Sequence, residues 1–241
     1  MLKAALGAIL LSLPLSAEAA VIEATFTGHL YTGADGLGLL GAPSQLQAGL
    51  PVVTTFRYDT TLGITPASPI FGAGLEGGQT LGVPSPVIFS SITVGQTTLL
   101  GQNSEYSIVG MIDDPALGHG MVVGGTSTYQ RVPQAGTYAT IAAQFYGQGI
   151  SVPSSIDVPF SMAGLMALNV QGGTSRATGS FQFENCVAAY QCGYTIGGFF
   201  IDDFRSQILP AAVPLPASGG LLLAALGAGG ALRRKKAAPQ G

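Results

Sequence analysis

Two pairs of adjacent carboxylates are the residues of this sequence best suited to acid–base chemistry: Asp113-Asp114, which Pro115 follows, and Asp202-Asp203. A glycosidase needs two acids that face each other across a sugar, and these pairs would supply them if a sheet brought them together. Asp-Asp-Pro is also a common turn sequence, in which Asp accepts hydrogen bonds from backbone donors. The turn is the preferred interpretation of the first pair. A hydrolase is therefore the least favoured of the three functions considered below, after a non-enzymatic matrix protein and a carbohydrate-binding module.

The second pair, Asp202-Asp203, falls in a strand-like segment. Adjacent side chains of a strand point to opposite faces, so we expect one of the two carboxylates to point inward. That carboxylate would cap a bulge or pair with Arg205.

Other catalytic and metal-binding chemistry has few candidates. The chain has two histidines, His29 and His119, and the second stands between glycines, as is typical of a turn or surface residue. Asp35 in TGADGLG could offer calcium a carboxylate, but the segment lacks the alternating acids of an EF-hand loop. No G-x-S-x-G elbow, H-E-x-x-H pair or P-loop occurs. We therefore expect neither an enzyme nor a metal cofactor.

The aromatic residues leave a binding function open. Tryptophan, which is well suited to stacking on sugars, is absent. Eight tyrosines could replace it, although tyrosines on strands more often fill the edge of a core. A line of exposed tyrosines on one sheet face would favour carbohydrate binding; the candidates are Tyr31, Tyr58, Tyr106, Tyr129, Tyr138, Tyr146, Tyr190 and Tyr194.

The two cysteines, Cys186 and Cys192, have five residues between them. Strand-like sequence flanks them on both sides, FQFEN before and GYTIGGFFI after, so a disulfide would join the two arms of a hairpin. Outside the cytoplasm such a pair most simply forms a structural disulfide. A metal site would need further ligands, and neither histidine is near in sequence.

Charge excludes one class of partner. Charged residues make up 9% of the 241 residues, and hydrophobic residues 47%. From Ala20 to Pro216 there are four arginines against eleven acids, a net charge of −7. Such a body cannot neutralise several phosphates, so we expect no nucleic-acid binding. The 36 glycines and 15 prolines show no Gly-X-Y period, which excludes collagen.

The elements that must position these residues are β-strands. Apolar residues alternate with polar ones from Ile22 to Tyr31 and from Val52 to Tyr58, the period of a strand with one buried face. Turn residues separate the segments, which predicts an all-β, antiparallel β-sandwich or jelly roll. The stretch 65–86, rich in glycine and proline, is expected to be a loop or edge cover, and 161–169 a short helical piece. The other predicted strands are 87–94, 105–112, 120–125, 137–147, 177–184 and 194–204.

The N-terminus, residues 1–19, has the pattern of a secretory signal peptide. Lys3 precedes an apolar run of about 12 residues, which is shorter than the roughly 20 that span a membrane. Ala17 and Ala19 then fit the small-x-small cleavage rule, which predicts cleavage after Ala19, with Ala20 as the alternative. An N-terminal membrane anchor is the competing interpretation.

The C-terminus predicts a weak membrane anchor. A proline-rich linker, 210–216, leads into an uncharged run, 217–232, and a basic tail, 233–241. Sixteen helical residues span about 24 Å, less than a hydrocarbon core of about 30 Å. The positive-inside rule places the basic cluster in the cytoplasm and the body outside. That stop-transfer cluster is Arg233, Arg234, Lys235 and Lys236.

These features together resemble the PEP-CTERM class of sorting tails in its VPLPA variant. The motif is Val213, Pro214, Leu215, Pro216 and Ala217, and motif, apolar run and basic cluster follow in the order of that class. The resemblance implies a Gram-negative bacterium that makes exopolysaccharide or biofilm, and an exosortase-type transpeptidase that removes the tail. The run is richer in glycine and poorer in leucine than the class pattern. An ordinary membrane helix is the alternative.

The segment from Ala24 to Gly63 also looks like a recurrent ectodomain of such proteins, which implies no activity. The sequence thus predicts a β-sandwich ectodomain over 20–209 and a single C-terminal transmembrane helix. We expect an exported, non-enzymatic envelope or matrix protein, with its body periplasmic before processing and at the cell surface or extracellular afterwards. The alternative is a carbohydrate-binding module for exopolysaccharide, with calcium as an optional clamp.

Overall fold

The computed structural model describes residues 20–41, 43–101, 105–126, 136–170, 175–188 and 191–210. The chain divides into two units, Met1–Leu209 and Pro210–Gly241, and every strand belongs to the first. The strands are β1 (Val21–Asp35), β2 (Ser44–Gln45), β3 (Pro51–Asp59), β4 (Phe71–Gly77), β5 (Val87–Val94), β6 (Thr97–Gly101), β7 (Tyr106–Asp114), β8 (Gly118–Thr126), β9 (Gly136–Gly147), β10 (Ser161–Met162), β11 (Arg176–Ala188) and β12 (Gln191–Ile208). Helical structure among these residues is limited to η1 (Gln79–Leu81) and α2 (Ala167–Val170).

All twelve strands form one antiparallel sheet. Its order is β4-β7-β8-β9-β11-β12-β1-β3-β5-β6, with β2 added to β1 and β10 to β12. Most neighbours in the sheet follow each other among the long strands of the chain. There are two exceptions: β12 pairs with β1, the last long strand with the first, and β4 leaves the β3–β5 side to pair with β7 at the far edge.

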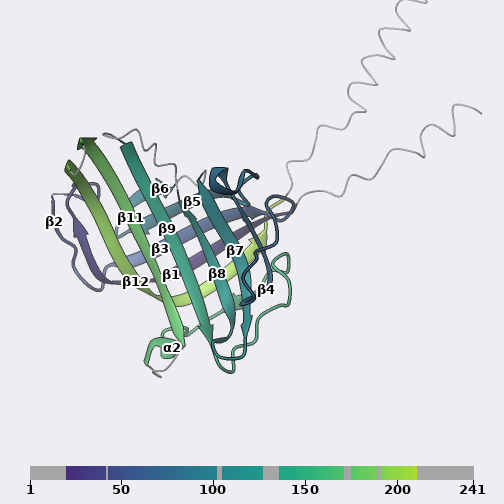
Figure 1. Ribbon diagram of the computed structural model, residues 1–241. Coiled ribbons are helices and arrows are strands. Elements are labelled where there is room, and N and C mark those ends of the chain that lie inside the picture. Colours follow the sequence, from purple (N-terminus) through teal and green to yellow (C-terminus); the bar gives the residue numbers. More distant parts are fainter. Residues whose placement is uncertain are drawn as a thin grey trace, which may run out of the picture. The chain divides into compact units, whose positions relative to one another are not determined.

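The sheet folds over on itself into two crossing layers (Figure 1). Strands β7, β8, β9 and β11 form one layer, and β3, β5 and β6 cross behind it. Strand β5 lies against β7, β8 and β9, and β6 lies against β9. The long strands β1 and β12 join the layers, and their pairing has register shifts after Thr27 and after Leu30. Bulges of this kind bend strands where a sheet turns a corner.

The eight strands predicted from alternation are all present, and the helical piece expected within 161–169 is partly found in α2. The sandwich-like all-β architecture is confirmed, but the jelly-roll alternative is wrong. A jelly roll consists of two sheets linked by Greek keys, whereas the strands described here all belong to one continuous sheet. The stretch 65–86 is more than a loop, because it contains β4. The glycines of this strand remove the alternation of apolar and polar side chains that would have indicated it. One of them, Gly74, packs against the Val109 carbonyl of β7, and a Cβ at this position would lie 2.8 Å from the carbonyl oxygen.

The core between the layers is aromatic at its centre. The ring of Phe204 from β12 lies 4.8 Å from that of Phe26 on β1 and 5.3 Å from that of Phe145 on β9, between centroids. Phe56 from β3 meets Phe26 edge-on at 5.9 Å. All four side chains are buried. Each of these large rings buries much apolar surface between the two layers. Their tilted ring–ring contacts stabilise the fold beyond the effect of the buried area alone.

Two glycines of the long strands make room for rings from the strand opposite. Gly179 of β11 pairs with Phe199 of β12, and Phe181 of β11 pairs with Gly197 of β12. A Cβ at Gly197 would lie 2.5 Å from the Phe181 ring, and one at Gly179 would overlap the Phe199 ring. Each phenylalanine therefore lies over a cross-strand glycine, which lets the sheet bend tightly here.

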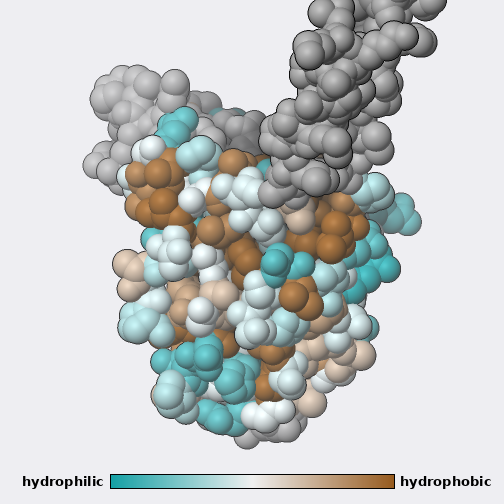
Figure 2. All heavy atoms as spheres, turned by 90° about the vertical axis from the view of Figure 1, so that its right-hand side faces the viewer, coloured by the Kyte–Doolittle hydropathy of each residue, from teal (hydrophilic) through white to brown (hydrophobic). Residues whose placement is uncertain are grey.

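The outer surface carries few charges. Figure 2 shows hydrophobic residues scattered over one face among weakly polar and hydrophilic ones. This pattern agrees with a chain in which only 9% of residues are charged.

Several predicted segments lie outside the described residues: the signal peptide 1–19, the sorting motif and apolar run within 211–232, and the basic tail 233–241. Within the described part of the chain, no helix is long and apolar enough to cross a membrane.

Replacing Gly179 with alanine should lower the free energy of unfolding by about 3 kcal/mol, because the new methyl group overlaps the buried Phe199 ring. Gly124→Ala is the control, since a Cβ there lies 3.1 Å from the Ala142 Cβ and meets no backbone or ring atom at a shorter distance. Denaturant unfolding followed by circular dichroism measures both variants. Equal losses would contradict the proposed role of the Gly179–Phe199 pair.

Candidate functional site

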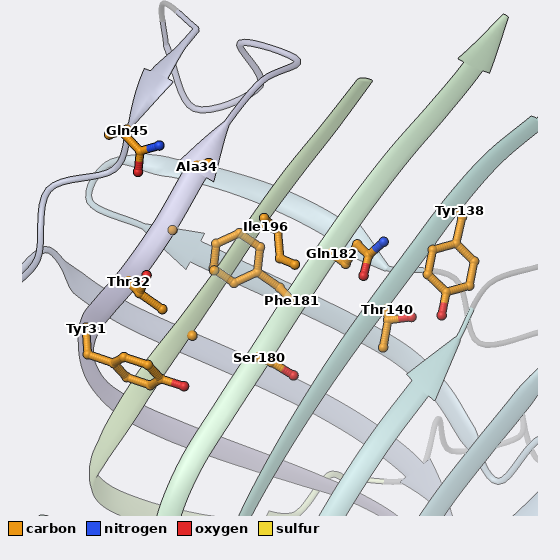
Figure 3. A pocket seen from close by; sticks show the side chains of 13 residues that line it. Tyr31, Thr32, Ala34, Gln45, Tyr138, Thr140, Ser180, Phe181, Gln182 and Ile196 are labelled. Carbon is orange, nitrogen blue, oxygen red and sulfur yellow. The ribbon is translucent and has the colours of Figure 1, made fainter. Parts of the chain in front are cut away.

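A groove of about 460 Å³ lies on the outer face of the sheet, across β9, β11, β12 and β1 (Figure 3). It is the best candidate for a binding site among the described residues. Most of its lining side chains occupy the outward positions of their strands, opposite the buried core positions. The lining comprises residues 31–34, 138, 140, 180–182 and 196–198, together with Gln45 from β2.

The floor of the groove depends on a glycine. Gly198 of β12 has no side chain, and the Tyr31 ring lies over it; a Cβ at Gly198 would lie 2.5 Å from the Tyr31 hydroxyl oxygen. Tyr31 takes this position because the β1–β12 register shifts between Leu30 and Thr32. The bulge lets two consecutive side chains, Tyr31 and Thr32, both face solvent, although a regular strand would turn one of them inward.

A row of rings continues from the groove along β1 and β12. Tyr31 and Phe200 lie with their ring centroids 4.6 Å apart and an interplanar angle of 32°. His29 meets the edge of Phe200 at 5.7 Å, and its Nδ1 lies 3.1 Å from Oδ2 of Asp202. The Tyr31 side chain is 44% exposed, so the row ends at the groove in an accessible aromatic surface.

Asp35 anchors the loop that forms one end of the groove. Its buried carboxylate accepts hydrogen bonds from the backbone N–H groups of Leu39 and Leu40, at 2.9 and 2.8 Å, and from the Thr195 hydroxyl at 2.6 Å. The loop returns as β2, where Gln45 pairs with Ala34. Three protein donors thus bind the carboxylate that we considered as a calcium ligand. Asp35 instead stabilises the loop through these hydrogen bonds.

The lining is uncharged and combines polar groups with apolar ones, among them Phe181 and Ile196. Hydroxyl groups come from Thr32, Thr140 and Ser180, and carboxamides from Gln45 and Gln182. The Thr140 Oγ1 is buried and has no hydrogen-bond partner among the described residues. Gln182 of the lining donates from Nε2 to Oε2 of Glu184 at 3.4 Å. The groove therefore offers hydrogen-bond donors and acceptors beside an aromatic ring, without a formal charge.

Of the tyrosines considered from the sequence, Tyr31 and Tyr138 line the groove, and Tyr194 is exposed on the same face of β12. Tyr58 is a core residue: its hydroxyl donates to the Ile156 carbonyl at 2.8 Å, and burial raises its pKa. Tyr106 donates to Glu76 at 3.0 Å, and burial with this contact raises its pKa to about 12. Tyr129 and Tyr190 lie outside the described residues.

The first carboxylate pair forms a turn, as its sequence indicates. Asp114 Oδ1 accepts hydrogen bonds from the backbone N–H groups of Ala116 and Leu117, at 2.8 and 2.9 Å. Asp113 pairs across the β7–β8 hairpin with His119, with 3.2 Å between Oδ1 and Nδ1. His119 therefore lies in the strand just after the turn, in an exposed ion pair.

The expectation that one carboxylate of Asp202-Asp203 points inward is wrong. Asp202 is the extra residue of the bulge that separates the Thr27–Asp203 and Gly28–Ile201 pairs. Both carboxylates therefore face outward: Asp202 contacts His29, and Asp203 accepts the Gly164 N–H at 3.1 Å. Arg205 contacts neither carboxylate in any ion pair among the described residues.

The two carboxylate pairs lie on strands that are not neighbours in the sheet. Their strands, β7 and β12, have β8, β9 and β11 between them. Four strand spacings amount to about 19 Å along the sheet, whereas glycosidase carboxyls lie about 5 to 10 Å apart.

The predicted disulfide is present between Cys186 and Cys192, directly opposite each other at the β11–β12 hairpin. Glu184 lies beside them, which gives the one group of three possible metal ligands among the described residues. Both sulfurs are committed to the disulfide, so this group has no thiolate to offer a metal.

Sequence reasoning missed the groove itself. The relevant signal, two glycines in GYTIGGFFI, is present in the sequence. However, the position of Tyr31 over one of them depends on a bulge between strands that lie far apart in the chain.

No protein-family model, curated protein or solved structure matches this chain.

Replacing Asp35 with alanine should lower the free energy of unfolding by about 3 kcal/mol, because the change removes the acceptor for two backbone N–H groups and a buried hydroxyl. Asp203→Ala, which removes one exposed acceptor, is the control and should cost less than about 1 kcal/mol. Chemical denaturation measures both. Similar losses in the two variants would show that Asp35 does not anchor the loop.

Reduction of the Cys186–Cys192 disulfide should lower the free energy of unfolding by about 2 kcal/mol, the chain-entropy estimate for a short closed loop. Unfolding curves with and without dithiothreitol test this. The double variant Cys186→Ser, Cys192→Ser should not respond to the reductant. Equal stability of the oxidised and reduced wild-type protein would refute the expectation.

Proposed function

We propose that this chain is an exported, non-enzymatic envelope or matrix protein of a Gram-negative bacterium, sorted by its C-terminal tail. One observation carries the proposal: VPLPA at 213–217, an uncharged run and a basic cluster follow in that order. The motif would be recognised by an exosortase-type transpeptidase in the inner membrane. Before processing the body is periplasmic and the basic cluster cytoplasmic; afterwards the protein resides at the cell surface or outside the cell.

The ends of the folded domain support this arrangement. The backbone N–H of Leu209 donates to the carbonyl of Val21 at 2.8 Å, so the chain enters and leaves the domain at neighbouring positions. The two ends of the described domain, to which a signal and a tail would be joined, therefore lie beside each other.

The hydrogen bonds at the N-terminus favour cleavage after Ala19. The carbonyl of Ala20 accepts hydrogen bonds from the backbone N–H and the hydroxyl of Thr60, at 3.2 and 3.3 Å. Cleavage after Ala19 retains both bonds, whereas cleavage after Ala20 removes them. The disulfide also suits an oxidising compartment outside the cytoplasm.

Carbohydrate binding is a second candidate function, favoured by the groove with its exposed aromatic ring and uncharged polar lining. Exopolysaccharide is the ligand class that suits both the export route and the groove. Calcium assistance has less support, because the Asp35 carboxylate is occupied by protein donors.

Mass spectrometry of tryptic digests from the envelope and medium of the producing bacterium tests the sorting proposal. Trypsin cuts after Arg205 and Arg233, so an unprocessed chain yields the peptide 206–233. A sorted chain should yield instead a peptide that begins at Ser206 and ends at Pro216 or Ala217. The same digest should contain an N-terminal peptide that begins at Ala20 and ends at Arg57.

A variant with Pro214→Ala and Pro216→Ala provides the matched control, because it alters the motif and leaves the apolar run and basic cluster intact. It should retain peptide 206–233 in the membrane fraction. Intact wild-type peptide 206–233 in that fraction, with no shortened form, would overturn the sorting proposal and leave a weakly anchored membrane protein.

A further inference from the structure

We propose that the groove across β9, β11, β12 and β1 is a binding site for a neutral saccharide, with Tyr31 as the stacking platform and Gln182 and Gln45 as hydrogen-bonding groups. The proposal rests on the carbohydrate-binding function and adds the site and the class of sugar. It excludes polyuronates and sulfated chains as preferred ligands.

The aromatic platform is preorganised. The Tyr31 ring lies over Gly198 and packs against the Phe200 ring, with centroids 4.6 Å apart and 32° between the ring planes. A ring held in this way loses little conformational freedom when a ligand binds, so more of the contact energy appears as affinity. The ring is still 44% exposed, and its π-face carries the partial negative charge that attracts the C–H groups of a pyranose.

The polar lining matches sugar hydroxyls. A hydroxyl group both donates and accepts, and so do the carboxamides of Gln45 and Gln182 and the hydroxyls of Ser180 and Thr32. These side chains come from three strands, β1, β2 and β11, and converge on the hollow from two sides (Figure 3). A groove with an apolar ring and a few convergent polar groups is the usual form of a small-ligand site, and its volume of about 460 Å³ falls in the usual range.

Charge decides the class of sugar. No lining residue of the groove is an acid or a base. An anionic sugar would lose hydration without gaining a cationic partner, which is costly. Glu184, whose carboxylate accepts a hydrogen bond from Gln182 of the lining, would repel a uronate, and so would the net charge of −7 on the body. A neutral saccharide meets neither penalty.

Affinity electrophoresis of the mature secreted protein, in gels containing a defined polysaccharide, tests the inference. Three probes are used: dextran and a soluble β-glucan as neutral chains, and alginate as a polyuronate. The purified exopolysaccharide of the producing bacterium is a fourth. Retardation by at least one neutral chain, unaffected by EDTA, is the expected result, together with weaker retardation by alginate.

Variants assign the binding to the groove. Tyr31→Ala and Gln182→Ala should each weaken binding about tenfold or more, the loss expected for a contact worth about 1.4 kcal/mol. Tyr31→Phe keeps the ring and should bind like the wild type. Tyr194→Ala is the matched control, because Tyr194 is exposed on the same face of β12 but does not line the groove. Thermal unfolding of each variant shows that the fold is intact.

The outcomes separate the two proposals. Binding that is unchanged in Tyr31→Ala and Gln182→Ala would overturn the site and leave the carbohydrate-binding function standing. Preference for alginate over the neutral chains would overturn the class of sugar. Absence of binding to all four polysaccharides would overturn the carbohydrate-binding function itself.

Discussion

The pairing of the first long strand with the last, β1 with β12, is the interaction on which the rest of the structure depends. Thirteen residue pairs join the two strands over nearly their whole length. Without this seam, the chain would form two separate meanders, β1-β3-β5-β6 and β7-β8-β9-β11-β12, each with an exposed apolar face. Because the seam joins them, the two layers share one core, and the N- and C-terminal ends of the domain meet at the Val21–Leu209 hydrogen bond.

The seam also determines what the outer face can do. Its two bulges make Asp202 and Tyr31 face outward where a regular ladder would turn side chains inward. One bulge creates the Asp202–His29 contact, and the other places Tyr31 over Gly198 at the floor of the groove. The curvature that closes the core and the irregularity that opens the groove thus have the same origin. On the opposite side of β12, the Phe181 ring over Gly197 is part of the same bend.

Local pattern predicted much of the fold. The eight predicted segments are all strands. In 22–31 and 52–58 a period of two defines one buried and one exposed face. The disulfide and the Asp114 turn were predictable for a similar reason, since both depend on residues close together in the chain. Strand β4 was not predicted, because its three glycines remove the alternation of apolar and polar side chains. Its position at the edge of the sheet depends on its pairing with β7, which lies far along the chain.

The sequence by itself determined the all-β class of the fold and its low charge, because each follows from composition or from neighbours along the chain. Only the tertiary structure decided that the strands form a single folded sheet, that Asp202 and Asp203 both face outward, and that Tyr31 supports a groove. These features depend on register between β1 and β12, whose paired residues are up to 186 positions apart, as for Ile22 and Ile208. A one-residue shift in that register exchanges inward and outward side chains, and no local pattern records it.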